Sequence, residues 1–262
     1  MTSQKNYKTE AIIIKKTKFK EADRILTLYT PHLGKIQAIA KGVRRPRSKM
    51  SGHLELLTHS LVPLVKGKNI DTIIGCQTLK SFLAIKSNLE LLSYALYTIE
   101  LVNRFTEDNI ENYPLFKLLL ETLNHIDKGC NNELMLRYFE LRLLSFVGYR
   151  PQLQPCVSCH SVLKDVSLSF SPKAGGILCH DCRNPQPLTY NISVDALKFL
   201  RILQDYDYHT VNNFIPKRQV FYEIEWILRN YIRYLLERDI KSISWLDTLR
   251  QQNRNKKNNL GN

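Results

Sequence analysis

The segment 24–40 reads RILTLYTPHLGKIQAIA and predicts two β-strands joined by a tight turn. Apolar and polar residues alternate through Gly34–Ala40, and Pro31 and Gly34 bracket the turn. Further runs of this kind lie at 9–16, 54–65 and 70–79. Five short strands in one region are typical of a small barrel, so the sequence predicts an N-terminal OB-fold β-barrel.

The positive charge of the chain is concentrated in the same region. The first 52 residues contain 13 Lys or Arg and three acidic residues, so they carry +10 of the net charge of +14. Gly42–Gly52 includes Pro46 and a run of basic residues, which is typical of a mobile loop rather than a strand. A localised positive field favours binding to a polyanion, of which nucleic acid is the most common.

After Asn88 the apolar period becomes helical, with steps of three and four residues. Asn88, Pro114, Glu133, Ser193 and Pro216 mark the starts of five predicted helices. The helix from Glu133 to Val147 is apolar on nearly every side, which indicates a buried position within a helical bundle. The class predicted from these patterns is therefore α+β and multidomain.

Four of the six cysteines form two Cys-x-x-Cys pairs, Cys156/Cys159 and Cys179/Cys182. Between them, residues 166–178 alternate around a Pro- and Gly-containing turn and predict a hairpin that brings the pairs together. Four thiolates suit one tetrahedral Zn²⁺ and leave no position open for water, so we expect a structural site. Disulfides or unlinked thiols are the alternatives, as is a Cys₃His site that uses His160 or His180. Cys76 and Cys130 are isolated.

These patterns predict four parts. They are an OB-fold nucleic-acid-binding domain at 1–80, a helical domain at 81–149 and 191–249, an inserted Cys₄ zinc module at 150–190, and a disordered basic tail at 250–262. The sequence has no apolar run long enough to cross a bilayer and no apolar stretch typical of an export signal near Met1. We therefore expect a cytoplasmic protein with no membrane partner. Binding to a membrane surface through the basic block is the alternative, and it is disfavoured because the basic residues there alternate with apolar ones as in strands.

Several short motifs, in their order along the chain, resemble the RecO family of bacterial recombination mediators and DNA-annealing proteins. They are Glu21–Leu26, Gly34-Lys35, Ala40–Gly42, Arg44–Ser48, Arg137–Glu140, Gly148–Pro151, Phe170–Pro172, Gly175-Gly176 and the two cysteine pairs. The resemblance spans about residues 8–245. One departure is His160, where zinc-bearing members often have Gly, so the turn there is expected to be strained or differently shaped.

The resemblance implies an N-terminal OB-fold, a helical domain and an inserted zinc module. It implies a function in recombinational DNA repair, in which the protein binds single- and double-stranded DNA and helps to load the recombinase RecA. It also implies two protein partners, RecR and the acidic C-terminal tail of the single-stranded-DNA-binding protein SSB. Such a protein is expected to be nucleoid-associated.

The basic residues of the first domain are the candidate DNA contacts. They are Arg24, Lys35, Lys41, Arg44, Arg45, Arg47 and Lys49. Contacts from such residues to phosphates are collective and carry no sequence specificity. The alternative is that these side chains are simply solvated.

Arg137 is the candidate anchor for the terminal carboxylate of the SSB tail, because it matches the basic position of the family's Arg-x-Phe-Glu stretch. The alternative is a structural ion pair with Glu133, four residues earlier on the same predicted helix.

The sequence contains no recognisable catalytic motif for nucleotide hydrolysis, zinc proteolysis or acyl transfer. We therefore expect binding without catalysis. The main alternative function is a nucleic-acid-binding regulator that makes its contacts through the zinc module, although residues 150–190 carry a net charge of only +2. An enzyme with scattered catalytic residues is a third class.

Overall fold

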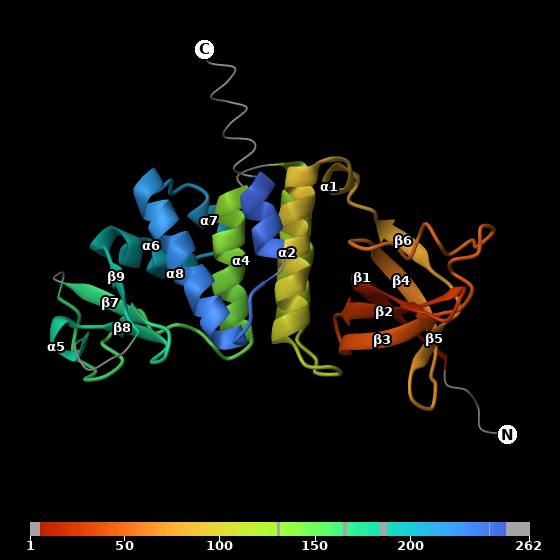
Figure 1. Ribbon diagram of the computed structural model, residues 1–262, viewed down its shortest axis with the longest axis horizontal. Coiled ribbons are helices and arrows are strands. Elements are labelled where there is room, and N and C mark those ends of the chain that lie inside the picture. The colour runs from red at the N-terminus through yellow and green to blue at the C-terminus, as the bar shows by residue number, and fades with distance from the viewer. Residues whose placement is uncertain (1–5, 130–131, 165–166, 184–187, 241, 250–262) are drawn as a thin grey trace, which may run out of the picture. The chain divides into compact units, whose positions relative to one another are not determined.

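The computed structural model describes residues 6–129, 132–164, 167–183, 188–240 and 242–249 (Figure 1). The chain forms two compact units, one of Met1–Cys130 with Lys241–Asn262 and one of Asn131–Ile240. Cys130 and the predicted disordered tail at 250–262 lie outside the described residues.

The first unit contains a six-stranded sheet. Its strands are β1 (Asn6–Phe19), β2 (Asp23–Thr30), β3 (Gly34–Ala40), β4 (His59–Val65), β5 (Asp71–Ile73) and β6 (Gln77–Lys80), in the order β1-β2-β3-β5-β4-β6. Strand β1 pairs with β4 through Asn6–Ile12 and with β2 through Ile12–Phe19, so the pairings return to β1. The N-terminal sheet is therefore confirmed, and the OB-fold stays a prediction.

Two predicted strands have different limits in the structure. The run at 54–65 enters the sheet only at His59, because residues 55–58 form turns in which Leu57 has a φ of 58°. The run at 70–79 is divided into β5 and β6 on either side of Gly75-Cys76. Alternation alone did not predict these breaks in backbone pairing.

The alternating apolar residues of the strands form the core of the sheet. It contains Ala11, Ile13, Leu26, Leu28, Ile36, Ala38, Ala40, Val43, Leu54, Val62, Leu64 and Ile73. Val43 and Leu54 come from the segment between β3 and β4, and Met50 packs against the same cluster. This segment is therefore folded onto the sheet by buried side chains, although it contains only turns.

Three helices complete the described part of the sheet unit before residue 130: α1 (Leu83–Ser87), α2 (Leu89–Phe105) and α3 (Tyr113–Lys128). The side chain of Asn88 accepts hydrogen bonds from the N–H groups of Glu90 and Leu91, which confirms the predicted N-cap of α2. Phe116 of α3 stacks on Tyr29 of β2, with ring centroids 6.5 Å apart.

The second unit combines helices with a small sheet. Its elements are α4 (Asn132–Phe146), β7 (Leu168–Ser171), β8 (Gly176–Leu178), α5 (His180–Arg183), β9 (Tyr190–Ile192), α6 (Val194–Asp205), α7 (Tyr208–Val211) and α8 (Arg218–Leu236). The predicted hairpin is present as β7–β8, with β9 on the other edge of β7. Helices α4, α6 and α8 pack pairwise, and α4 is buried on several sides, as its sequence predicted.

The compact units group the predicted parts differently from the sequence. Helices α1–α3 belong to the same unit as the N-terminal sheet, whereas the cysteine module belongs to the same unit as α4, α6 and α8. Among the described residues, no helix is long and apolar enough to cross a membrane.

Candidate metal centre and nucleic-acid interface

The sulfur atoms of Cys156, Cys159, Cys179 and Cys182 all lie within 4.8 Å of one another. The Sγ atoms of Cys159 and Cys179 are 3.7 Å apart. A disulfide would require about 2.05 Å, whereas two ligands of a tetrahedral zinc ion with Zn–S bonds of about 2.3 Å lie about 3.8 Å apart. The donor set and its spacing therefore fit a structural zinc ion.

The backbone of the first cysteine turn explains how these sulfur atoms converge. The N–H of His160 donates to the carbonyl of Cys156 at 2.9 Å, and the N–H of Cys156 donates to the carbonyl of Ser161 at 3.0 Å. His160 has a φ of 58°, the left-handed conformation that Gly adopts most easily. Neither His160 nor His180 belongs to the ligand cluster found among the described residues, so a Cys₃His site has no support here.

The environment of Cys159 favours the thiolate form that binds metals. The hydroxyl and the backbone N–H of Ser161 lower the pKa of the Cys159 thiol to about 6, and the two side chains are 3.0 Å apart. The N–H of Cys179 points toward Sγ of Cys156 at 3.4 Å. Donors of this kind stabilise negative charge on sulfur before any ion binds.

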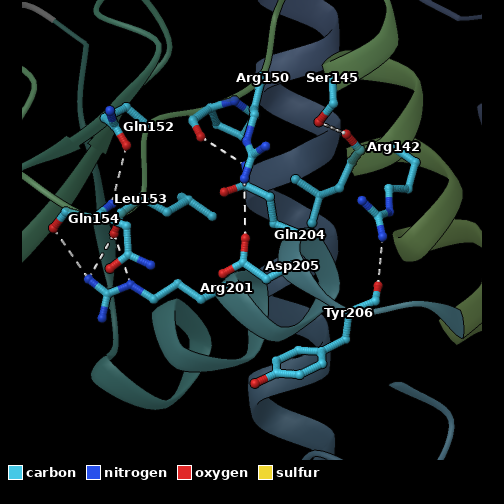
Figure 2. A network of polar contacts seen from close by, with 12 residues as sticks. Arg142, Ser145, Arg150, Gln152, Leu153, Gln154, Arg201, Gln204, Asp205 and Tyr206 are labelled. Carbon is cyan, nitrogen blue, oxygen red and sulfur yellow. Dashed lines mark hydrogen bonds and ion pairs between the residues drawn. The ribbon is translucent and has the colours of Figure 1, made fainter. Parts of the chain in front are cut away.

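A polar network attaches the cysteine module to α6 (Figure 2). The guanidinium of Arg201 donates to the carbonyl of Leu153 through Nε at 2.9 Å and through an Nη at 2.8 Å. Nε2 of Gln204 donates to the carbonyl of Pro151 at 3.0 Å, and Arg150 pairs with Asp205 at 3.2 Å. These contacts hold the segment that leads into Cys156 against the helix.

The module also packs directly on α8. The rings of Phe170 and Tyr231 meet edge to face at 5.2 Å, and the Tyr231 hydroxyl donates to the carbonyl of Tyr149. The cysteine module is therefore built into the second unit, and its metal ligands are positioned by contacts with two helices.

The basic loop, residues 41–49, is tied to the turn between β1 and β2. The N–H of Gly42 donates to Oδ1 of Asp23 at 2.7 Å, and the N–H of Arg44 donates to the carbonyl of Ala22 at 3.0 Å. A guanidinium nitrogen of Arg44 also donates to the carbonyl of Glu21 at 2.8 Å. The loop and the β1–β2 turn therefore form one surface.

Five of the seven predicted DNA contacts lie on this surface and are exposed. They are Lys41, Arg44, Arg45, Arg47 and Lys49. Lys18 and Lys20, at the end of β1 and in the turn, are also exposed and belong to the same surface. Sequence reasoning included both among the basic residues but did not select them; their alternation with Thr17 and Phe19 was the available signal.

Lys35 occupies a different environment. Its ammonium group donates to the carbonyls of Asn103 and Thr106 at the C-terminal end of α2 and pairs with Asp108 at 3.3 Å. Only 12% of its side chain is exposed. Lys35 therefore satisfies the terminal carbonyls of a helix, and the structure offers no open phosphate site at this residue.

The environment of Arg24 is intermediate between those of the exposed basic-loop residues and of the mostly buried Lys35. It sits at the start of β2, paired across the sheet with Lys18 and Ala40, and its guanidinium is 3.6 Å from Glu55. Glu55 also pairs with Lys16. Part of the charge of Arg24 is therefore compensated within the protein.

Arg137, the candidate anchor for the SSB tail, is 1% exposed and is among the largest fully buried side chains. Its guanidinium contacts Glu140 at 2.6 Å and Glu225 of α8 at 3.3 Å. Glu225 also pairs with Arg229 at 2.8 Å. The ion-pair alternative thus has structural support from Glu140 and Glu225, and the pair with Glu133 stays a prediction.

Two family models together match nearly the whole chain. The model described as Recombination protein O N terminal matches residues 1–82, and that described as Recombination protein O C terminal matches residues 86–243. The change from one model to the other falls close to the predicted domain limit at residue 80.

Individual relatives match over similar lengths. A DNA repair protein RecO from Dehalococcoides mccartyi strain CBDB1 is 45% identical over 250 residues, which cover 95% of this chain and 98% of the relative. RecO proteins from Roseiflexus sp. and Halalkalibacterium halodurans are 40% and 30% identical and cover 94% and 93% of the chain, with 86% and 95% of their own lengths aligned. With both family models matched and these relatives aligned over almost their full length, the chain belongs to the RecO family of DNA repair proteins.

Proposed function

We propose that this protein is a recombination mediator and strand-annealing protein that binds single- and double-stranded DNA through the basic loop and the β1–β2 turn. Membership of the RecO family supports a role in recombinational repair. The observation that carries the proposal is the exposed cationic surface made by Lys41–Lys49 with Lys18 and Lys20.

The physical mechanism is charge neutralisation. Each phosphate contact releases counterions from DNA, so several cations on one surface bind the backbone without reading its sequence. Two complementary strands repel each other until their charge is neutralised. A protein that binds both strands therefore lowers the barrier to pairing and needs no catalytic group.

The zinc ion is proposed to have a structural role. Cys156, Cys159, Cys179 and Cys182 would hold it, and a bound ion would fix the turns on which the module's packing against α6 and α8 depends. Metal binding supplies much of the folding free energy of small modules of this kind.

RecR, SSB and RecA enter the proposal through the family resemblance. We propose that the protein binds RecR and the SSB tail, gains access to SSB-coated strands in the nucleoid of the cytoplasm, and helps to load RecA. The burial of Arg137 supports an internal role for this residue. A direct contact with a peptide carboxylate would have to displace one of its present carboxylate partners.

Annealing of complementary strands coated with SSB tests the proposal. The intact protein is expected to accelerate pairing strongly, and a variant with Arg44, Arg45 and Arg47 changed to Ala is expected to lose most of that acceleration. Equal annealing rates for the two proteins, both shown to be folded, would reject the basic loop as the site. No acceleration by the intact protein would reject the function.

A further inference from the structure

One face of α8 carries a stripe of arginine and aromatic side chains, most of which are exposed. Its members follow steps of four, four, three and four residues, so they share one face of the helix. They are Arg218, Tyr222, Trp226, Arg229 and Arg233. We call this set the α8 stripe. The opposite face of the helix is buried through Ile224, Ile227, Leu228 and Tyr231.

The two aromatic members are both exposed. Trp226 is 50% exposed and Tyr222 is 37% exposed. Trp226 meets Tyr190 of β9 edge to face at 4.5 Å, and the Arg218 guanidinium lies over the Tyr222 ring at 5.5 Å from its centroid. The Nε of Arg218 also donates to the Tyr222 hydroxyl at 2.7 Å. The rings are thus held in defined positions while their surfaces still face solvent.

The charges along the stripe have one sign. Three of its five members are Arg and none is acidic. The Arg229 side chain is only 18% exposed and pairs with the buried Glu225 at 2.8 Å, so Arg218 and Arg233 are the outward cations of the stripe. The nearest outward acid, Glu223, is turned to Ser193, whose N–H and hydroxyl donate to its two carboxylate oxygens. Arg233 pairs with Asp239, but both side chains are largely exposed, so that pair is weak.

We propose that the α8 stripe is a second surface for single-stranded DNA, separate from the basic loop. Exposed aromatic rings stack on unpaired bases of any sequence, and arginines beside them bind the phosphates between those bases. Tyr222 and Trp226 are about 6 Å apart along the helix axis, which gives each ring room for its own base. A duplex keeps its bases stacked inside and offers nothing to these rings.

This inference rests on the proposed function and extends it. An annealing protein must hold two strands, and the chain then has two chemically different surfaces for them. The basic loop offers cations without a committed stacking residue and suits any backbone, whereas the stripe selects unpaired bases. The α8 stripe and the basic loop belong to different compact units of the chain.

The alternative reading is that Trp226 only packs β9 onto α8. Tryptophan fluorescence separates the two readings, because the chain has two tryptophans, Trp226 and Trp245. In the zinc-loaded, full-length protein with Trp245→Phe, titration with oligothymidylate is expected to quench Trp226 emission to saturation. A duplex of equal length, at equal occupancy of the protein, is expected to quench it much less.

Affinity measurements with matched variants form the second arm. Tyr222→Ala with Trp226→Ala is expected to weaken single-strand binding about fivefold or more while duplex binding is retained. Because these changes could also loosen β9, a double variant with Arg218→Ala and Arg233→Ala serves as an independent test. Its slope of log affinity against log salt should be about 1.4 shallower than that of the parent. Tyr234→Ala, an aromatic 41% exposed on the same helix but off the stripe, is the control and should match the parent.

The outcomes distinguish this inference from the proposed function. If the parent binds strands but Trp226 emission does not change and both stripe variants bind like the parent, the stripe is not a DNA surface; a protein partner would then be its remaining occupant. If the parent binds no DNA at all, the proposed function itself fails. Quenching, with loss of single-strand affinity confined to the stripe variants, supports the inference.

Discussion

The backbone N–H of Gly42 donates a 2.7 Å hydrogen bond to Oδ1 of Asp23. One acidic side chain therefore fixes the start of the most basic loop in the described chain to the β1–β2 turn. Arg44 continues the attachment through its own N–H and its guanidinium. The positions of the loop cations thus depend on the carboxylate of Asp23. The effect of net charge on DNA binding can therefore be tested separately from the effect of loop attachment.

Asp23→Ala separates them. The change makes the surface one charge more positive, so electrostatics alone would strengthen DNA binding. We predict the opposite, an affinity about two- to tenfold lower, because a charged acceptor typically contributes about 1.5–3 kcal/mol and the loop loses its attachment.

Asp23→Asn is the matched control for that variant. It retains an acceptor oxygen for the Gly42 N–H while adding the same positive charge, so it should bind DNA at least as tightly as the parent. Fluorescence anisotropy with a labelled duplex measures both. Tighter binding by Asp23→Ala would show that loop attachment does not matter.

Lys35 and Lys41 are expected to behave in opposite ways. Lys35→Met removes the donors to the carbonyls of Asn103 and Thr106, so we predict a loss of about 1.5–3 kcal/mol in the free energy of unfolding and little change in DNA affinity. Lys41→Met should leave stability within about 0.5 kcal/mol of the parent and weaken DNA binding. Chemical denaturation and anisotropy on the two variants check this, and a reversed pattern would restore Lys35 as a DNA contact.

His160→Gly tests the cysteine turn. Since His160 has a φ of 58°, Gly relieves a conformation that costs an L-residue about 1 kcal/mol. We predict full zinc content, one ion per chain by elemental analysis, and slower loss of zinc to a chelator. Cys156→Ser should lose the metal and lower the melting temperature. Loss of zinc from His160→Gly would instead identify His160 as a ligand.

Arg137→Ala is predicted to be strongly destabilising. It removes the cation that contacts both Glu140 and Glu225, and breaking a buried pair from one side costs about 3–5 kcal/mol. Binding of an SSB-tail peptide should fall only in proportion to the fraction of the variant that is unfolded. A stable Arg137→Ala protein that has lost peptide binding alone would favour the direct-anchor hypothesis.

Much of this arrangement was predictable from local sequence. The Cys-x-x-Cys pairs predicted the sulfur cluster, Asn88 and Ser193 predicted helix starts, and alternation predicted β2 and β3. In each case the signal lies within a few residues and reflects a local geometric requirement, such as a cap, a turn or a buried face.

What the sequence did not predict depends on distant contacts. In the sequence, Lys35 cannot be told apart from the other basic residues. Only the fold brings its ammonium group to the end of α2, 68 residues further along the chain. Glu225 became a partner of Arg137 only when α8 packed on α4. The α8 stripe could not be predicted from the sequence, because the strong apolar period of the same helix reports only on its buried side.

The salt dependence of DNA binding tests the central claim most directly. Arg45→Ala with Arg47→Ala removes two charges from the basic loop, and Lys66→Ala with Lys68→Ala removes two exposed charges from the β4–β5 turn of the same unit. For duplex DNA, the loop variant should bind more weakly, with a slope of log affinity against log salt about 1.8 shallower, while the turn variant keeps the parental slope. Equal slopes for the parent and the loop variant, with both folded, would contradict the assignment of the basic loop as the DNA-binding surface.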